Sequence, residues 1–182
     1  MCETPVPDRP TVPDANVRAD TYFVASTTAR CWHCGTSTRL LALALPDGHE
    51  VLEDSADADI DADAAAGGER AFQEWQRSSA SALLFYVEHL PEEVREQLRE
   101  ISSCFHPGYS VATLNAYWAN HCEFCGTLLD DHDLHCEPDS AFCLAGETAA
   151  ARIDLLHIEK PFAAAAAGYS FEPEFFDLVR RS

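Results

Sequence analysis

The stretch from Tyr117 to Gly126 reads Y-W-A-N-H-C-E-F-C-G and ends in a C-x-x-C-G unit. A second unit of the same form, C-W-H-C-G, occupies residues 31–35. In each unit, two cysteines three positions apart precede a glycine, which tolerates the positive φ of a tight turn. Two thiolates on such a turn can face a single metal ion. Each unit therefore has the form of a zinc knuckle.

Together, the two units supply four thiolates, from Cys31, Cys34, Cys122 and Cys125. Four thiolates form a closed structural zinc site with no open coordination position. The gap between Cys34 and Cys122 is far longer than the about 15–20 residues of a single ribbon. The spacing therefore predicts a split zinc ribbon, in which one Zn²⁺ ties an N-terminal hairpin to the C-terminal half. Three alternatives stay open: a redox dithiol, two unrelated buried thiol pairs, and a site in which a histidine replaces a cysteine.

Other cysteines and histidines could form a second metal site. They are Cys104, His106, His132, His135, Cys136 and Cys143. Their spacings match no ordered metal-binding motif, which favours an interpretation as ordinary loop and core residues.

Composition limits the class of partner. The chain has 182 residues with 12 Lys and Arg against 31 Asp and Glu, a net charge of -19. This charge repels nucleic-acid phosphates and anionic lipid and favours a basic protein partner. No apolar run approaches the about 18 residues of a membrane span, and the N-terminus lacks a signal-peptide pattern. We therefore expect a cytoplasmic protein, in which eight cysteines are metal ligands or free thiols rather than disulfides.

Sequence patterns divide the chain into four segments. Residues 1–20 are Pro-rich and predict an extended tail, and residues 21–52 predict a β-hairpin with the first knuckle. Residues 53–70, with alternating Asp and Ala, predict a flexible acidic linker. Residues 71–182 are expected to hold a helical pair, the second knuckle, and a C-terminal strand and helix. Residues 21–182 would form one structural domain.

The expected fold class is α+β, a split zinc ribbon with an inserted helical pair. Strands are predicted at 22–25 and 39–45, with 51–52 returning as a hairpin, and at 114–121 and 152–159. Apolar residues spaced by three and four predict a helix over 71–90, and Pro91 is expected to start a second helix. Residues 104–110 and 130–140 are expected to be irregular, and 171–181 to form a closing helix.

Evidence for an enzyme is weak, because the sequence has no G-x-S-x-G, H-E-x-x-H, P-loop or G-x-G-x-x-G motif. Two enzymatic alternatives remain. One is a thiol-disulfide oxidoreductase that uses a C-x-x-C unit, and the other is a hydrolase that uses the acidic and histidine side chains of the 131–136 loop.

Several motifs together resemble a family of uncharacterised bacterial proteins of zinc-ribbon type, in which C-W-x-C pairs with Y-W-A-N-H-C-x-x-C-G. The matching segments are 31–34, 117–126 and L-H-x-E-P at 134–138, and R-I-D-L-L-H-I-E-K-P-F at 152–162 is also similar. The resemblance implies zinc binding and implies no reaction.

The sequence thus predicts a non-catalytic, acidic protein with structural zinc that binds a basic protein as an inhibitor, immunity protein or adaptor. Side chains beside or after the second knuckle are candidates for partner contact, although aromatic residues beside a knuckle more often form its packing shell. The candidates are Tyr117, Trp118, Asn120 and His135.

Overall fold

A computed structural model describes residues 12–54, 73–137, 140–143, 151–171 and 180–181. The described chain is built mainly from antiparallel strands with two helices, α1 (Glu92–Ile101) and α2 (Asp131–His135). The strands are β1 (Val17–Ala19), β2 (Tyr22–Arg30), β3 (Ser37–Leu45), β4 (Glu50–Asp54), β5 (Gln73–Arg77), β6 (Ala82–His89), β7 (Phe105–Ser110), β8 (Asn115–His121), β9 (Leu128–Leu129), β10 (Asp154–Ile158), β11 (Phe162–Phe171) and β12 (Arg180–Arg181). The predicted α+β class with a helical pair is therefore wrong, and the fold is β-rich.

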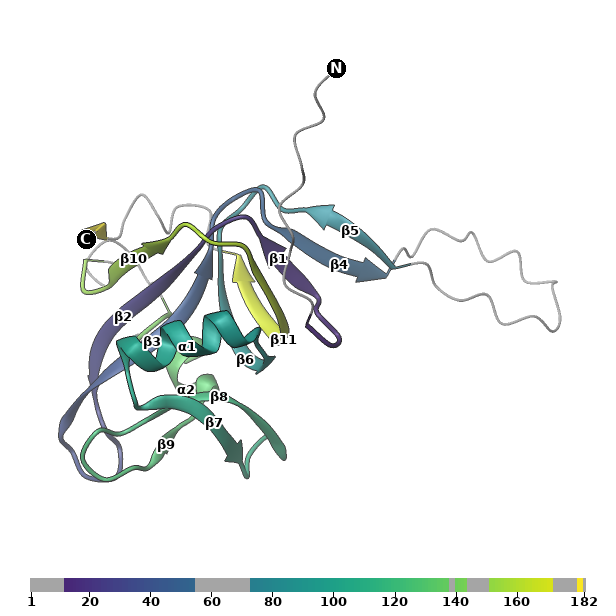
Figure 1. Cartoon of the computed structure of the whole chain (residues 1–182). Helices are drawn as coiled ribbons and strands as arrows, with labels where there is room; N and C mark the ends of the chain where they lie inside the picture. Colours follow the sequence, from purple (N-terminus) through teal and green to yellow (C-terminus); the bar gives the residue numbers. More distant parts are fainter. Residues whose placement is uncertain (1–11, 55–72, 138–139, 144–150, 172–179, 182) are drawn as a thin grey trace, which may run out of the picture.

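The strands form one continuous hydrogen-bonded path in the order β12-β10-β2-β3-β6-β11-β1-β4-β5, from which β8 branches at β6 and carries β7 and β9. All neighbours pair antiparallel except β10 and β12. Figure 1 shows α1 in front of the central strands and the β4–β5 hairpin projecting from the opposite end of the molecule from the β7–β8 hairpin.

The central strands are buried on both faces. Leu41, Leu43 and Leu45 of β3 belong to one apolar cluster, which also contains Val94 and Leu98 of α1. The alternate residues of β3 belong to a second cluster with α2 and the 140–143 segment; they are Leu40, Ala42 and Ala44. Double-sided burial explains why β3 is a continuous apolar run rather than an alternating one.

The helix expected over 71–90 is replaced by the strands β5 and β6. Spacings of three and four cannot distinguish a helix from a strand when an apolar run is buried all round. Ala82, Leu83 and Leu84 are such a run, because they are buried on both faces of the sheet. Pairing of β6 with β3, β8 and β11 therefore decides its conformation.

Strand β6 changes partner along its length. Its first residues pair with β3, from Leu45↔Ala82 to Leu43↔Leu84. It then turns to β8 at Val87↔Trp118, and a register shift interrupts its pairing with β11 between Ala165 and Ala166. This divergence opens a gap beside β3 that β8 enters, and it brings the second knuckle towards the first.

Other local predictions have mixed outcomes. The strands expected at 22–25, 39–45, 114–121 and 152–159 and the helix after Pro91 are confirmed. Residues 51–52 lie in β4, which pairs with β1 and β5 rather than returning along β3. The expected loops at 104–110 and 130–140 instead contain β7 and α2, and the expected tail contains the buried strand β1. Most of the acidic linker and of the closing helix, residues 55–70 and 172–179, lies outside the described residues, although Phe171 and Arg180–Arg181 are in strands.

Candidate metal centre

Each C-x-x-C-G unit forms the turn of a β-hairpin. The first lies between β2 and β3, after the pair Arg30↔Ser37, and the second between β8 and β9, after His121↔Leu128. The expectation that the first unit lies in a tight turn between strands is confirmed.

The two turns have the same backbone hydrogen bonds. The N–H of Gly35 donates to the carbonyl of Cys31 at 2.8 Å, and the N–H of Gly126 donates to that of Cys122 at 2.9 Å. Both glycines have positive φ, +71° and +69°. This left-handed conformation is costly for residues with a Cβ, so glycine at these two positions has a direct physical reason.

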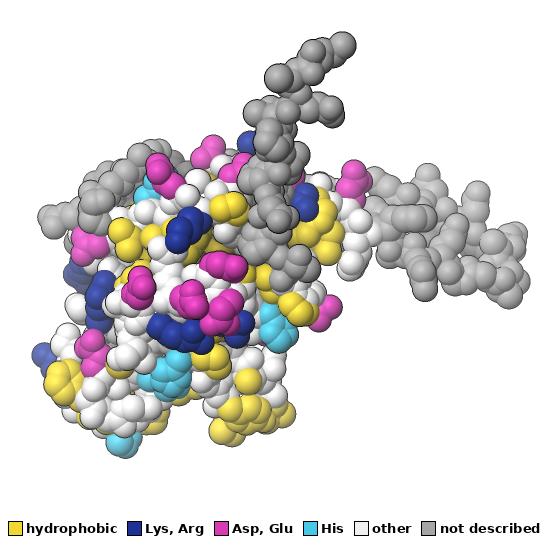
Figure 2. Space-filling view, in the orientation of Figure 1, with side chains coloured by type: hydrophobic (Ala, Val, Ile, Leu, Met, Phe, Trp, Pro, Cys, Tyr) yellow, Lys and Arg dark blue, Asp and Glu magenta, His cyan; other side chains and the backbone are white. Residues whose placement is uncertain are grey.

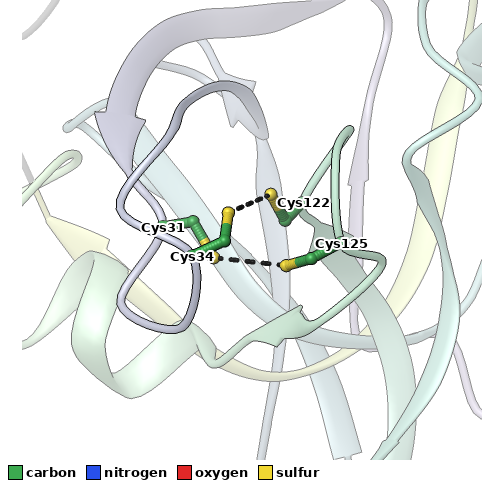
Figure 3. Close-up of side chains that lie close together, drawn as sticks. All are labelled: Cys31, Cys34, Cys122 and Cys125. Carbon is green, nitrogen blue, oxygen red and sulfur yellow. Dashed lines mark hydrogen bonds between the residues drawn. The ribbon is translucent and has the colours of Figure 1, made fainter.

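The four cysteine sulfurs converge between the two hairpins, as Figure 3 shows. The Sγ atoms of Cys31 and Cys125 are 3.7 Å apart, those of Cys34 and Cys122 are 3.6 Å apart, and all four lie within 4.8 Å of one another. These separations are too long for a disulfide, whose sulfurs are about 2.05 Å apart. The structure therefore brings all four predicted ligands into one group of thiols.

The spacing suits a tetrahedral metal ion. A zinc–sulfur bond of about 2.3 Å in a regular tetrahedron separates neighbouring sulfurs by about 3.8 Å. The close pairs join one hairpin to the other, so an ion at the centre would cross-link β2–β3 to β8–β9. Cys31 and Cys122 are buried in the second apolar cluster, whereas Cys34 and Cys125 are exposed.

A threonine follows each glycine and favours the thiolate form of the exposed cysteine. Hydrogen bonds with Thr36 lower the pKa of the Cys34 thiol. Cys125 Sγ lies 3.3 Å from Thr127 Oγ1, and hydrogen bonds with Thr127 lower the pKa of this thiol to about 5. Thiolates are the form that binds metal. The pattern is thus C-x-x-C-G-T in both hairpins, and the repeated threonine is the sequence signal that extends the predicted site.

The buried thiol of Cys31 behaves differently. A backbone hydrogen bond from Cys34 lowers its pKa, but burial and the neighbouring sulfurs of Cys125 and Cys122 more than offset this, and the pKa is raised to about 11. Four sulfurs so close cannot all be thiolates without a compensating cation. This donor set therefore fits a divalent ion.

Hydrogen bonds outside the sulfurs hold the hairpins together. Glu123, between the second pair of cysteines, donates its N–H to Thr38 Oγ1 at 3.1 Å and accepts the N–H of Arg39 with its carboxylate at 3.2 Å. Asn120 accepts the N–H of Leu41 and donates to its carbonyl, both at 2.8 Å. These contacts fix β8 against β3 independently of any ion.

Three of the four predicted partner-contact residues lie inside the protein, and the fourth, His135, is half-buried. Tyr117, Trp118 and Asn120 are 1%, 4% and 2% exposed. The Tyr117 hydroxyl accepts the N–H of Asp131, and the ring of Trp118 packs near that of Phe105. The His135 ring stacks on Phe142, and burial lowers its pKa to about 3. Tyr117, Trp118 and Asn120 present no open surface in this conformation; the exposed aromatics beside the cysteines are instead Trp32 and Phe124.

The 131–136 segment has little of the geometry that a hydrolase needs. Asp131 is 3% exposed and its carboxylate accepts the N–H of Tyr86 at 2.7 Å. Nδ1 of His135 is buried without a hydrogen-bond partner among the described residues. A 310 Å³ cavity is lined by residues of β4, β5 and the following turn and by none of residues 131–136.

Within the described residues, the four cysteines are the only group of three or more Cys, His, Asp or Glu side chains arranged to hold a metal. Cys104, His106, His132, His135, Cys136 and Cys143 do not form a second one. His106 instead stacks on His121 with ring centroids 3.8 Å apart.

The fold and the site together define a β-rich protein with a four-cysteine centre that could hold a metal ion. No protein-family model, curated protein or solved structure matches the chain. Neither helix in the described part of the chain is long and apolar enough to cross a membrane.

Proposed function

We propose that the chain is a non-catalytic binding protein whose fold is cross-linked by one structural Zn²⁺. Cys31, Cys34, Cys122 and Cys125 would hold the ion. The observation that carries this proposal is the convergence of four sulfurs from two hairpins within 4.8 Å. Soft thiolates favour zinc over magnesium or calcium. With four protein ligands, the ion would have no open position for water or substrate, so its contribution would be to stability.

The redox alternative has less support. A dithiol of thioredoxin type lies at a helix N-terminus, where the dipole stabilises its thiolate. Here each C-x-x-C lies in a β-hairpin turn, and the closest sulfur pairs join different hairpins. Such cross-hairpin pairs are typical of ligands around a shared ion.

Metal analysis of the purified chain tests the zinc centre. Protein prepared under reducing conditions without added metal should contain one zinc per chain. Cys122→Ser and Cys34→Ser should lose the ion and lower the unfolding temperature. Cys104→Ser is the matched control, because Cys104 lies outside the group of four and should retain the zinc. A chain that lacks metal and has four rapidly alkylated thiols, or a Cys122→Ser variant with full zinc content, would overturn the proposal.

The partner would be a basic protein. This part of the proposal is supported by the net charge of -19, which favours association with positive surfaces and speeds encounter at low salt. Inhibitor, immunity and adaptor roles all fit such binding. Affinity for the partner should fall as the salt concentration is raised. An affinity that does not change with salt concentration would contradict a charge-based interface.

A further inference from the structure

The tip of the β7–β8 hairpin exposes large apolar side chains. Tyr109, Val111 and Leu114 are 60%, 79% and 72% exposed, and we call these three residues the hairpin tip. Figure 2 shows hydrophobic side chains gathered at the lower right, where Figure 1 places the β7–β8 connection. Contiguous exposed apolar surface of this kind marks interaction sites in soluble proteins.

The turn at the tip has a leucine at a position with positive φ, where turns usually have glycine or asparagine. The connection between Ser110 and Asn115 reads V-A-T-L, and Leu114 has φ of 55°. Glycine or asparagine adopts this left-handed conformation more easily than leucine. Leu114 is therefore neither buried nor in a backbone conformation that is favourable for leucine. Such local conflicts concentrate at functional sites.

The tip is held in place by polar contacts on both sides. Ser110 donates its hydroxyl to Asp130 at 2.6 Å and accepts the N–H of Thr113 at 3.3 Å. On the other strand, the Asn115 amide donates to the carboxylate of Glu88. A tip fixed in this way loses little conformational entropy on binding, which favours affinity.

The surroundings of the tip are acidic. The carboxylates of Asp130 and Glu88 flank it through the contacts just described, and the sequence has no Lys or Arg between Arg99 and Arg152. The other exposed aromatics, Trp32 and Phe124, lie in the two knuckles, where Arg30 and Arg39 are also exposed. The tip thus combines exposed apolar side chains with neighbouring carboxylates, which complements a basic protein.

We infer that the hairpin tip anchors a protein partner that has a hydrophobic pocket rimmed by Lys and Arg side chains. Val111 and Leu114 would enter the pocket, and Asp130 and Glu88 would face its rim. The inference rests on the proposed binding of a basic partner and adds the surface that binds it. Self-association through the tip is disfavoured by like charge, as is insertion into an anionic membrane.

Photo-cross-linking locates the partner. The zinc-loaded chain would carry benzoylphenylalanine in place of Val111 in one sample and of Leu156 in another. Leu156 is an exposed leucine of β10, on a strand far from the tip in Figure 1. In an extract of cells that make the chain, the protein cross-linked from position 111 but not from 156 would be identified and purified, and its affinity measured by calorimetry.

Leu114→Asn separates binding from folding. Asparagine suits the left-handed backbone, so the unfolding temperature should stay the same or rise. Loss of the apolar anchor should weaken binding of the purified partner about tenfold or more. The matched control, Leu156→Asn, should change the affinity by less than about twofold.

Two results would count against the inference, and they differ in what they imply. If the purified partner binds the wild-type chain with salt-sensitive affinity, but Leu114→Asn binds equally well, the tip is not the anchor and the proposed function stands. If no protein binds the wild-type chain in a salt-sensitive way, the partner proposal and the inference both fail. Neither result bears on the zinc content, which is measured separately.

Discussion

The backbone N–H of Tyr86 donates a 2.7 Å hydrogen bond to Oδ2 of Asp131, a carboxylate that is only 3% exposed. Tyr86 has φ of 52° and lies where β6 leaves β3 and turns to β8. At this bend the N–H of Tyr86 bonds to a side chain instead of a ladder partner. The Asp131 carboxylate therefore accepts the hydrogen bond that a carbonyl of a neighbouring strand would otherwise accept, and this bond fixes α2 to the sheet.

The same carboxylate should make stability depend on pH. Burial raises the pKa of Asp131 from the ordinary 3.8 to about 7; the hydrogen bond from Tyr86 opposes this rise and nearby Asp130 adds to it. Because the folded state holds the proton more tightly than the unfolded state, this contribution is complete below the unfolded pKa and is lost as pH rises through about 7. The zinc-loaded wild type should therefore lose stability relative to Asp131→Asn between about pH 4 and about pH 7, and the difference should be constant above about pH 8.

Urea denaturation of both proteins at each pH measures this difference. The comparison removes contributions that the two chains share. One of these is from the half-buried His135, whose pKa is lowered by burial to about 3 and which therefore changes stability in the opposite direction. Asp131→Ala serves as a second variant: it leaves the Tyr86 N–H buried and unpaired, at a cost of about 1–3 kcal/mol. Parallel stability curves for wild type and Asp131→Asn would contradict the expected pH dependence.

Asn120 makes the corresponding side-chain hydrogen bonds to β3, in the part of that strand that does not pair with β6. Strand β3 pairs with β6 from Leu43 onward but not before it, and in that earlier part the Asn120 amide bonds to both the N–H and the carbonyl of Leu41. Asn120→Ala would leave both buried groups unpaired and should lower the free energy of unfolding by about 2–4 kcal/mol. Since β8 leads directly into Cys122, zinc affinity should fall as well.

Asn16 provides a matched control for Asn120. Its amide makes the same pair of bonds to Ala166, at 2.7 and 2.9 Å, but in a partly exposed position. Water can replace the lost amide there, so Asn16→Ala should cost less and should leave zinc affinity unchanged. Chemical denaturation and competition with a chelator measure the two effects. Equal costs for the two variants would show that burial of Asn120 is not the source of its effect.

Local sequence patterns predict the parts of this structure whose causes are local. The two C-x-x-C-G units place their turns correctly, and the Pro91 start of α1 and the apolar run of β3 are equally clear. The grouping of four cysteines also follows from the sequence, since two units of the same C-x-x-C-G form supply the four thiolates of one tetrahedral site. These predictions needed no knowledge of which strands are neighbours.

Features that depend on distant pairing could not be predicted in this way. Strand β6 has a helix-like spacing, and only its neighbours β3, β8 and β11 make it a strand. From sequence, Tyr117, Trp118 and Asn120 are either partner contacts or the packing shell of a knuckle, and only the position of β8 beside β3 shows that they are buried. The burial of Asp131 also depends on a distant contact. Its segment has the sequence of a polar loop, and only the hydrogen bond from Tyr86 shows that the carboxylate is buried.

The glycines of the two knuckles should control metal affinity through the backbone alone. A Cβ at Gly35 or Gly126 would meet nothing within 4 Å, so crowding is not the obstacle, but φ is +71° and +69°. Alanine at either position should cost about 1–2 kcal/mol. Because this turn points the cysteines at the ion, Gly126→Ala should also weaken zinc binding, by about tenfold. Asparagine tolerates the left-handed region better, so Gly126→Asn should lose less than Gly126→Ala.

Gly168→Ala is the contrasting control for these variants. A Cβ there would lie 2.1 Å from the ring of Phe85, so the substitution should destabilise the β6–β11 pair through overpacking. Gly168 lies outside the knuckles, so Gly168→Ala should have the zinc affinity of the wild type in chelator competition. This should hold even if Gly168→Ala lowers the unfolding temperature more than Gly126→Ala does. If Gly168→Ala and Gly126→Ala lose zinc affinity in proportion to lost stability, the knuckle backbone has no specific role. If zinc affinity falls only in the Gly35 and Gly126 variants, and falls less with asparagine than with alanine, the left-handed turn orients the thiolates.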